Sequence, residues 1–437
     1  MKLFHEKNKG RIKEALWLFF GQSFTALSGF ITLKLFTSLL SPAEFGRYSL
    51  ANTVVLLVGV NLFDPYYQGF MRFWSVSEDR GAREEFITCL KWLAWRITAG
   101  VTVSGFIISV VVLYFYGLNW ALLILIAVFS GALSGKARLY LSVIIALRKR
   151  QISAFLNIIF SFLKPALALP VILYISSDAV STVFGIFMSG FVFLYMSFRY
   201  FSALVPESRK IIIRRNFSKI SDENSLCNEI HRFSAPFFIF CIFEWAYIAS
   251  DRWALQITRG PEIVAAFSVI GMLAFYPLVY GHNLLSGYFV PIAYQKAGGL
   301  KDRTAILNSR RILSVMLLLY VFGVIFLVLL FSVFGETLIP FISTAVYQKY
   351  AVFLPWLTFS WSLFYLGQLA SCFGMVMNKS RLYIWPKVSA GSSAAVLTII
   401  MAHFFGPVGV ICALGASGGC YALWCLVIAW RLNSTGN

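Results

Sequence analysis

The chain has 437 residues, of which 59% are hydrophobic and only 13% are charged. Soluble domains are roughly 45–50% apolar and about 25% charged, so this composition excludes an ordinary water-soluble protein. The net charge of +19 is therefore not taken as a sign of nucleic-acid binding, and the odd number of 7 cysteines excludes a secreted disulfide scaffold. The composition indicates an all-α polytopic membrane protein.

Apolar segments follow one another along the whole chain. A helix of about 20 apolar residues crosses a bilayer core, and helices satisfy their own backbone hydrogen bonds there. We expect about twelve transmembrane helices on this basis. Their expected ranges are 14–38, 48–70, 87–116, 120–147, 152–175, 180–203, 234–256, 262–292, 312–334, 350–376, 384–404 and 408–431.

Lys and Arg gather on one side of the expected membrane. The N-terminal tail and the loops after every second helix hold most of the 37 basic residues. The opposite loops contain only Arg47, Arg259 and Lys349. The positive-inside rule therefore predicts that both termini lie in the cytoplasm, and much of the net charge reports topology.

The longest polar stretch, a basic linker over 204–233, separates two sets of six expected helices. It predicts an N-terminal six-helix lobe over 1–203 and a C-terminal lobe over 234–437. Parallel repeats with a substrate site between them are a known transporter plan, so a central cavity and a carrier function are expected.

A short internal repeat supports this division. Aligning Pro42 with Pro261 also aligns Ser49 with Ser268. The two aligned segments each lie just after the first expected helix of their lobe.

No enzyme motif is found in the sequence. The segment 131–137 resembles a phosphate-binding loop, but its glycines are too close together and it lies inside an apolar segment. Its GxxxG pattern is better explained by close helix packing. The histidines have no metal-ligand spacing, so no metal or cofactor is expected. Uphill transport would need an ion gradient or a partner.

The informative residues are ionisable groups inside the expected helices. Each costs about 2.5–3.5 kcal/mol near the bilayer centre on insertion scales, so such groups normally face a bundle interior or an aqueous cavity. Those near helix ends are expected to reach the interface instead; they are Lys34, Lys91 and Lys387. The others are Arg96, Lys136, Arg138, Lys164 and Arg252, with the acids Asp64, Glu244 and Asp251.

Arg138 and Lys164 each share a helical face with small or polar residues. Two interpretations remain open for these faces. They line a central aqueous cavity, or they pack tightly through small residues while the charge pairs with a neighbour. Lys136 projects away from Arg138, so at most one of the two points directly inward.

The carboxylates are candidates for binding a coupling ion. Glu244 and Asp251 are seven residues apart and share a helical face. For Asp251, an internal ion pair with Arg252 is favoured over a ligand role. Glu244 has no partner nearby in the sequence, and a carboxylate in low dielectric has a raised affinity for protons. Asp64 lies within the second expected helix.

Several segments together resemble a known family, the bacterial polysaccharide-unit flippases. The resemblance rests on Gly21-Gln22, LLSPAEFGRYSL at 39–50, ALRKR at 146–150 and Ser250-Asp251-Arg252-Trp253. These flippases include the O-antigen type and belong to the multidrug/oligosaccharidyl-lipid/polysaccharide exporter (MOP) superfamily. The resemblance implies two six-helix lobes, a V-shaped cavity and alternating access in the bacterial inner membrane.

The resemblance also implies a substrate and partners. The substrate would be a sugar repeat unit on undecaprenyl pyrophosphate, moved from the cytoplasmic to the periplasmic leaflet using a proton or sodium gradient. Polysaccharide polymerase and glycosyltransferases would be partners. Basic groups would bind the pyrophosphate through charge-assisted hydrogen bonds; the candidates are Arg138, Lys164, Arg96 and Lys136, with Lys34 at an outer gate. Tyr276 and Tyr280 would stack on sugar rings.

Three other functions are considered. A cation-coupled multidrug exporter of the same superfamily would be expected to use an acidic cavity, whereas the first half of the chain has a basic excess. A membrane enzyme acting on lipid-linked glycans would need a substantial catalytic loop, and the outer loops are short. A channel fits poorly with an internal repeat and buried charges.

Overall fold

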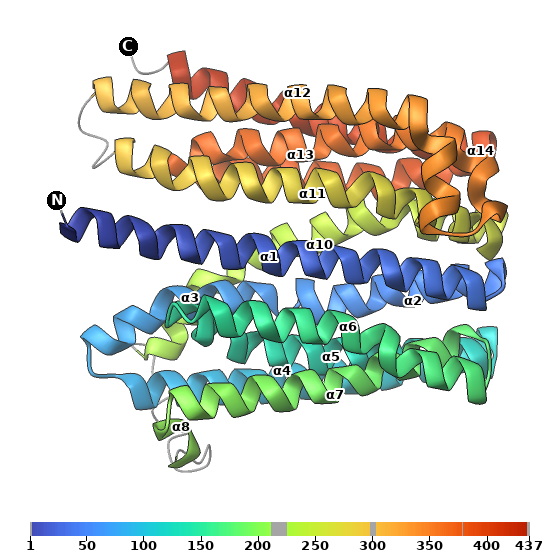
Figure 1. Ribbon diagram of the computed structural model, residues 1–437, viewed down its shortest axis with the longest axis horizontal. Coiled ribbons are helices and arrows are strands. Elements are labelled where there is room, and N and C mark those ends of the chain that lie inside the picture. The colour runs from blue at the N-terminus through green and yellow to red at the C-terminus, as the bar shows by residue number, and fades with distance from the viewer. Residues whose placement is uncertain (1, 211–224, 298–302, 378, 435–437) are drawn as a thin grey trace. The chain divides into compact units, whose positions relative to one another are not determined.

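The structure is a computed structural model that describes residues 2–210, 225–297, 303–377 and 379–434; within these ranges, side chains are described from residue 17 to 432, except for Leu18, Lys210, Arg303 and Ser380. The described residues are almost entirely helical (Figure 1). The first group of elements is α1 (Lys2–Leu39), α2 (Pro42–Leu56), the π turn η1 (Leu57–Asn61), α3 (Asp64–Asp79), α4 (Arg83–Tyr116), α5 (Leu118–Ala146), α6 (Arg150–Tyr174), α7 (Ala179–Leu204) and α8 (Glu207–Lys210). The second group is α10 (Leu226–Arg259), α11 (Pro261–Ala297), α12 (Arg303–Ile342), η3 (Ala345–Phe353), α13 (Leu354–Val376), η4 (Ser380–Tyr383) and α14 (Ile384–Ser434).

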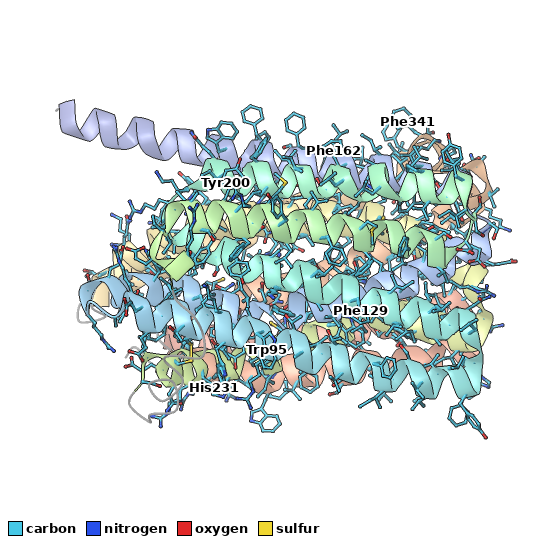
Figure 2. All side chains as sticks on the ribbon, turned by 90° about the horizontal axis from the view of Figure 1, so that it is seen from below. Trp95, Phe129, Phe162, Tyr200, His231 and Phe341 are labelled. Atoms are coloured by element: carbon cyan, nitrogen blue, oxygen red, sulfur yellow. A yellow bond between two sulfur atoms is a disulfide. The ribbon has the colours of Figure 1, made fainter. Side chains whose placement is uncertain are left out.

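The helices have the length and surface of membrane-spanning segments. In the described part of the chain, 8 helices are long and apolar enough to cross a bilayer. Large apolar side chains, including Trp95 and Phe341, are exposed along them (Figure 2). Such surface is stable only against lipid or another protein. The predicted all-α polytopic membrane fold is confirmed.

The last long helix, α14, is interrupted at Gly406, where φ is +59°. Glycine adopts this left-handed conformation without steric cost, and the following Pro407 cannot continue the first helix. The break separates the two final helices that the sequence predicts.

The second expected helix, 48–70, is broken into three pieces. After α2 the chain makes the π turn η1, and α3 starts at Asp64, which is followed by Pro65 in the first turn. Proline is favoured at the start of a helix because the amide hydrogen it lacks has no partner there. The break fixes Asp64 at a helix N-terminus, within the apolar part of the chain.

Contacts divide the chain into two compact units. Unit 1 contains residues 1–44 and 50–242, and unit 2 contains 45–49 and 243–437. The division falls inside α10, between Ile242 and Phe243, and so differs in position from the expected linker at 204–233. Of that linker, 211–224 lies outside the described residues.

Unit 1 is organised around α5, which contacts α3, α4 and α7, while α6 lies between α7 and α1 (Figure 1). Gly131 and Gly135 bring α5 against the broken second segment. A Cβ on Gly131 would lie 2.6 Å from Cβ of Val58, and one on Gly135 would lie 2.3 Å from the Phe63 ring. The GxxxG pattern is therefore a close packing contact, as predicted. A disulfide between Cys89 and Cys227 joins α4 to α10 in the same unit.

Unit 2 is built from α11, α12, α13 and α14, with extensive contacts between α13 and α14. It also holds the short segment 45–49. The Ser49 and Ser268 hydroxyls, which the internal repeat aligns, are hydrogen-bonded to each other at 2.5 Å. Residues that the alignment makes equivalent are therefore in direct contact.

The packing of Gly135 gives a stability prediction. Gly135→Val would force its new methyl groups into Phe63, and overpacking of this kind costs about 1–3 kcal/mol. Gly100→Val, on α4, meets no atom within 4 Å and is the matched control. We expect a lower melting temperature in detergent for the first variant and little change for the second. Equal melting temperatures would contradict the proposed close contact.

Candidate functional site

Of the predicted basic residues, Lys34 and Arg96 are exposed. The Arg96 guanidinium lies over the Trp92 ring at 4.9 Å. Arg96 is exposed on α4, whereas Arg138 and Lys164 are half-buried, so Arg96 differs from them in burial.

Arg138 forms an ion pair with Asp64. The Arg138 Nη2 donates to Asp64 Oδ1 at 2.6 Å, and the two side chains are 31% and 25% exposed. Tyr67, one turn after Asp64, places its ring 5.3 Å from the guanidinium carbon. The pair follows from the glycine contact, because Gly135 lies one turn from Arg138 and packs on Phe63, the residue before Asp64.

Lys164 lies close to this pair on α6. Its side chain is half-buried, and its ammonium lies over the Phe160 ring at 4.4 Å. Arg138 is near enough to repel it electrostatically. Among the described residues Lys164 makes no ion pair. We call Asp64, Tyr67, Arg138 and Lys164 the basic cluster; it holds more positive than negative charge.

The remaining bases of unit 1 lie elsewhere. Lys136 is half-buried, and its spacing from Arg138 places it on another face of α5. Lys91 was expected to reach the interface, and its ammonium donates to the backbone carbonyl of Ser208. Lys136 makes no ion pair among the described side chains.

Unit 2 contains a second paired charge. The Lys387 ammonium donates to Glu244 Oε2 at 2.8 Å, and the Gln368 amide donates to the same oxygen at 3.1 Å. The Tyr421 hydroxyl donates to Gln368 Oε1 at 3.3 Å. We call these four residues the Glu244 network. It joins α10, α13 and α14.

The expectation for Lys387 was wrong. Lys387 does not reach the interface but is only 1% exposed, whereas Glu244 is 34% exposed. The cause is a close approach of two helices: a Cβ on Gly391, one turn from Lys387, would lie 2.3 Å from the carbonyl oxygen of Phe243. This contact places Lys387 beside Glu244, the residue after Phe243. Glu244 thus has a partner 143 positions away in sequence.

Asp251 and Arg252 are both buried, but their side chains do not form the expected ion pair. Neighbouring helical residues project in different directions, so their charged ends do not meet. Asp251 Oδ1 accepts from the backbone N–H of Arg252 at 2.7 Å. Asp251 Oδ2 and Arg252 Nε have no hydrogen-bond partner among the described residues.

Two further features lie in unit 2. Tyr276 and Tyr280 stack on each other, with ring centres 6.0 Å apart. A cavity of about 260 Å³ between α12 and α13 is lined mainly by aliphatic side chains, with Tyr320, Phe359 and Ser362. No residue of the Glu244 network lines this cavity.

The fold and these charges define a polytopic helical membrane protein with a partly buried acid–base pair in each of two units. A family model described as polysaccharide biosynthesis protein matches residues 12–293. The chain belongs to the polysaccharide biosynthesis protein family. No curated protein matches the sequence.

Solved structures with the same fold come from the MOP superfamily. An outward-facing multidrug resistance transporter of the MATE family is 14% identical, with a TM-score of 0.68, over 97% of this chain and 95% of its own. The lipid II flippase MurJ, in an inward closed conformation, is 13% identical, with a TM-score of 0.70, over 95% and 87%. A Pyrococcus furiosus transporter of the superfamily is 14% identical, with a TM-score of 0.63, over 97% and 96%. These likenesses show that the chain shares its fold with transporters of this superfamily.

The Glu244 network gives a stability prediction. Lys387→Met leaves the half-buried Glu244 without its counter-ion. Removing one partner of a fully buried pair destabilises a protein by about 3–5 kcal/mol, and the loss of stability should be smaller here because Glu244 is partly exposed. We expect a clear fall in melting temperature. Adding Glu244→Gln should restore most of it, because replacing both charges is often neutral. Failure of the second change to rescue the first would argue against the ion pair.

Proposed function

We propose that this protein is a flippase for oligosaccharide repeat units linked to undecaprenyl pyrophosphate. It moves them from the cytoplasmic to the periplasmic leaflet of the bacterial inner membrane for surface polysaccharide synthesis, and both of its termini lie in the cytoplasm. The observation that carries the proposal is the basic cluster, on membrane-spanning helices of a polysaccharide biosynthesis family member.

The basic cluster suits a pyrophosphate group. Arg138 offers a planar set of donors that matches phosphate oxygens, and Lys164 adds a compact positive charge. With one carboxylate for two bases, the cluster keeps an excess of positive charge inside the apolar region. A ligand with negative charge on both phosphates would offset that excess, while its polyprenyl chain remains in the bilayer.

Asp64 gives the site a means of ion coupling. It occupies Arg138 when no phosphate is bound, so the carboxylate and the substrate compete for one guanidinium. Asp251, which is fully buried, is a further candidate for the coupling ion. We propose that a proton or sodium gradient drives alternating access through one of these carboxylates.

A multidrug exporter is the second candidate, because MATE transporters share the fold. It would bind organic cations, and the positive excess of the basic cluster disfavours them. Polysaccharide polymerase and glycosyltransferases are proposed partners, since they would consume and supply the lipid-linked glycan.

Neutral substitution of the cluster tests substrate binding. Arg138→Gln and Lys164→Gln should each reduce translocation about 10- to 100-fold, since a hydrogen bond to a charged group contributes about 1.5–3 kcal/mol. The measurement is the amount of lipid-linked glycan in the outer leaflet of cells with equal protein levels. Lys136→Gln, on the same helix but another face, is the matched control and should retain translocation. Full translocation by both cluster variants would refute the phosphate site.

Replacing Asp64 tests the coupling. Asp64→Asn keeps a hydrogen-bond acceptor beside Arg138 but removes the competing charge. Pyrophosphate should bind more tightly to this variant, while translocation in proteoliposomes slows at least about tenfold and loses its dependence on the ion gradient, because the amide carries no charge to bind a coupling ion. A wild-type dependence on the ion gradient in Asp64→Asn would show that the coupling ion binds elsewhere.

A further inference from the structure

We propose that unit 2 contains a separate subsite for neutral sugar hydroxyls, centred on Glu244 and Gln368. This inference rests on the proposed function and concerns unit 2 by itself: the glycan part of the proposed substrate would bind the Glu244 network.

The geometry leaves one carboxylate oxygen of Glu244 available. Lys387 and Gln368 both donate to Oε2, and no described residue donates to Oε1. Oε1 is also not among the buried atoms that lack a partner, which agrees with the partial exposure of the side chain. The carboxylate is thus fixed by its inner oxygen and can accept a hydrogen bond through its outer one.

The Gln368 amide is oriented by its two partners. Its nitrogen donates to Glu244, and its oxygen accepts from the Tyr421 hydroxyl. Networks satisfied in this way hold polar groups rigidly, so little ordering is needed when a ligand binds.

Charge decides which kind of ligand suits this place. Lys387 is almost fully buried, and its ammonium lies 4.5 Å from the centre of the Phe364 ring and 5.7 Å from that of Tyr421. It therefore neutralises Glu244 from the inner side and cannot move freely into water. A bound cation would be repelled by Lys387, and a phosphate by Glu244. A neutral ligand rich in hydroxyl groups meets neither obstacle.

Aromatic groups lie beside the carboxylate. His282 is half-buried on α11, and Tyr365 follows Phe364, whose ring centre lies 4.5 Å from the Lys387 ammonium that pairs with Glu244. The His282 and Tyr365 rings have centres 5.5 Å apart. Binding sites typically combine such apolar ring surface with a few fixed polar groups. A sugar offers both a C–H face for a ring and hydroxyls for Glu244, so the network matches a glycan.

The test uses two neutral variants of the full-length protein in nanodiscs. Glu244→Gln with Lys387→Met keeps an acceptor at position 244, whereas Glu244→Leu with Lys387→Met removes it. Both replace the whole ion pair and should fold, which melting temperatures will check. The probes are inorganic pyrophosphate and the free oligosaccharide released by mild acid from the polyprenyl-linked repeat units of the producing cells.

Saturation-transfer NMR should show oligosaccharide binding within about threefold of wild type for the glutamine variant, and binding weakened about three- to tenfold for the leucine variant, the value of one neutral hydrogen bond. Pyrophosphate binding should be unchanged in both. Equal oligosaccharide binding by the two variants would overturn the subsite. It would also be overturned if sugar binding were unchanged in both variants while their translocation no longer depended on sodium or pH, because Glu244 would then be an ion site.

The same probes separate this inference from the proposed function. Pyrophosphate binding that depends on Arg138 and Lys164, without oligosaccharide binding to wild-type protein, would refute the subsite alone. Absence of binding by both probes would refute the flippase proposal and the subsite together.

Discussion

The cost of an ionised group in an apolar region governs the arrangement of this protein. Each unit meets that cost in the same way, by bringing an acid from one helix to a base on another. In unit 1 the pair is Asp64 with Arg138, and in unit 2 it is Glu244 with Lys387. Since removing one member of such a pair leaves an uncompensated charge, the two pairs constrain which helices must remain together.

In each unit a glycine allows the close helix contact that brings the acid and the base together. Gly135 lets α5 approach Phe63, the residue before Asp64, and Gly391 lets α14 approach Phe243, the residue before Glu244. In both units the base lies one turn from its glycine. Backbone contact at the glycine therefore sets the distance between the charges, and the short ion pair is a consequence of helix packing. A small residue one turn from a charged residue in an apolar helix therefore allows close helix packing and also positions the charged side chain against its partner.

Much of the fold follows from the sequence, but the charge partners do not. Apolar length predicts the long helices, and Gly406-Pro407 marks the division of the last one. Small residues near Arg138 indicated a special face, and the structure matches the second of the two explanations: α5 packs closely there and Arg138 pairs with Asp64. Lys387 was misjudged because depth was inferred from distance to a helix end, whereas burial depends on a contact with α10, far away in sequence. Only three-dimensional packing supplies that contact.

The two pairs differ in what surrounds them, and this difference has a functional consequence. Beside Asp64 and Arg138 stands Lys164, which has no ion pair among the described residues, so the site in unit 1 retains positive charge. Beside Glu244 stand an amide, two tyrosines and a histidine, and the pair in unit 2 is balanced. A lipid-linked glycan also has one strongly anionic part and one neutral, hydroxyl-rich part. A carrier of organic cations would need neither the excess base nor the balanced network, so the charge distribution supports the proposed glycan-lipid substrate.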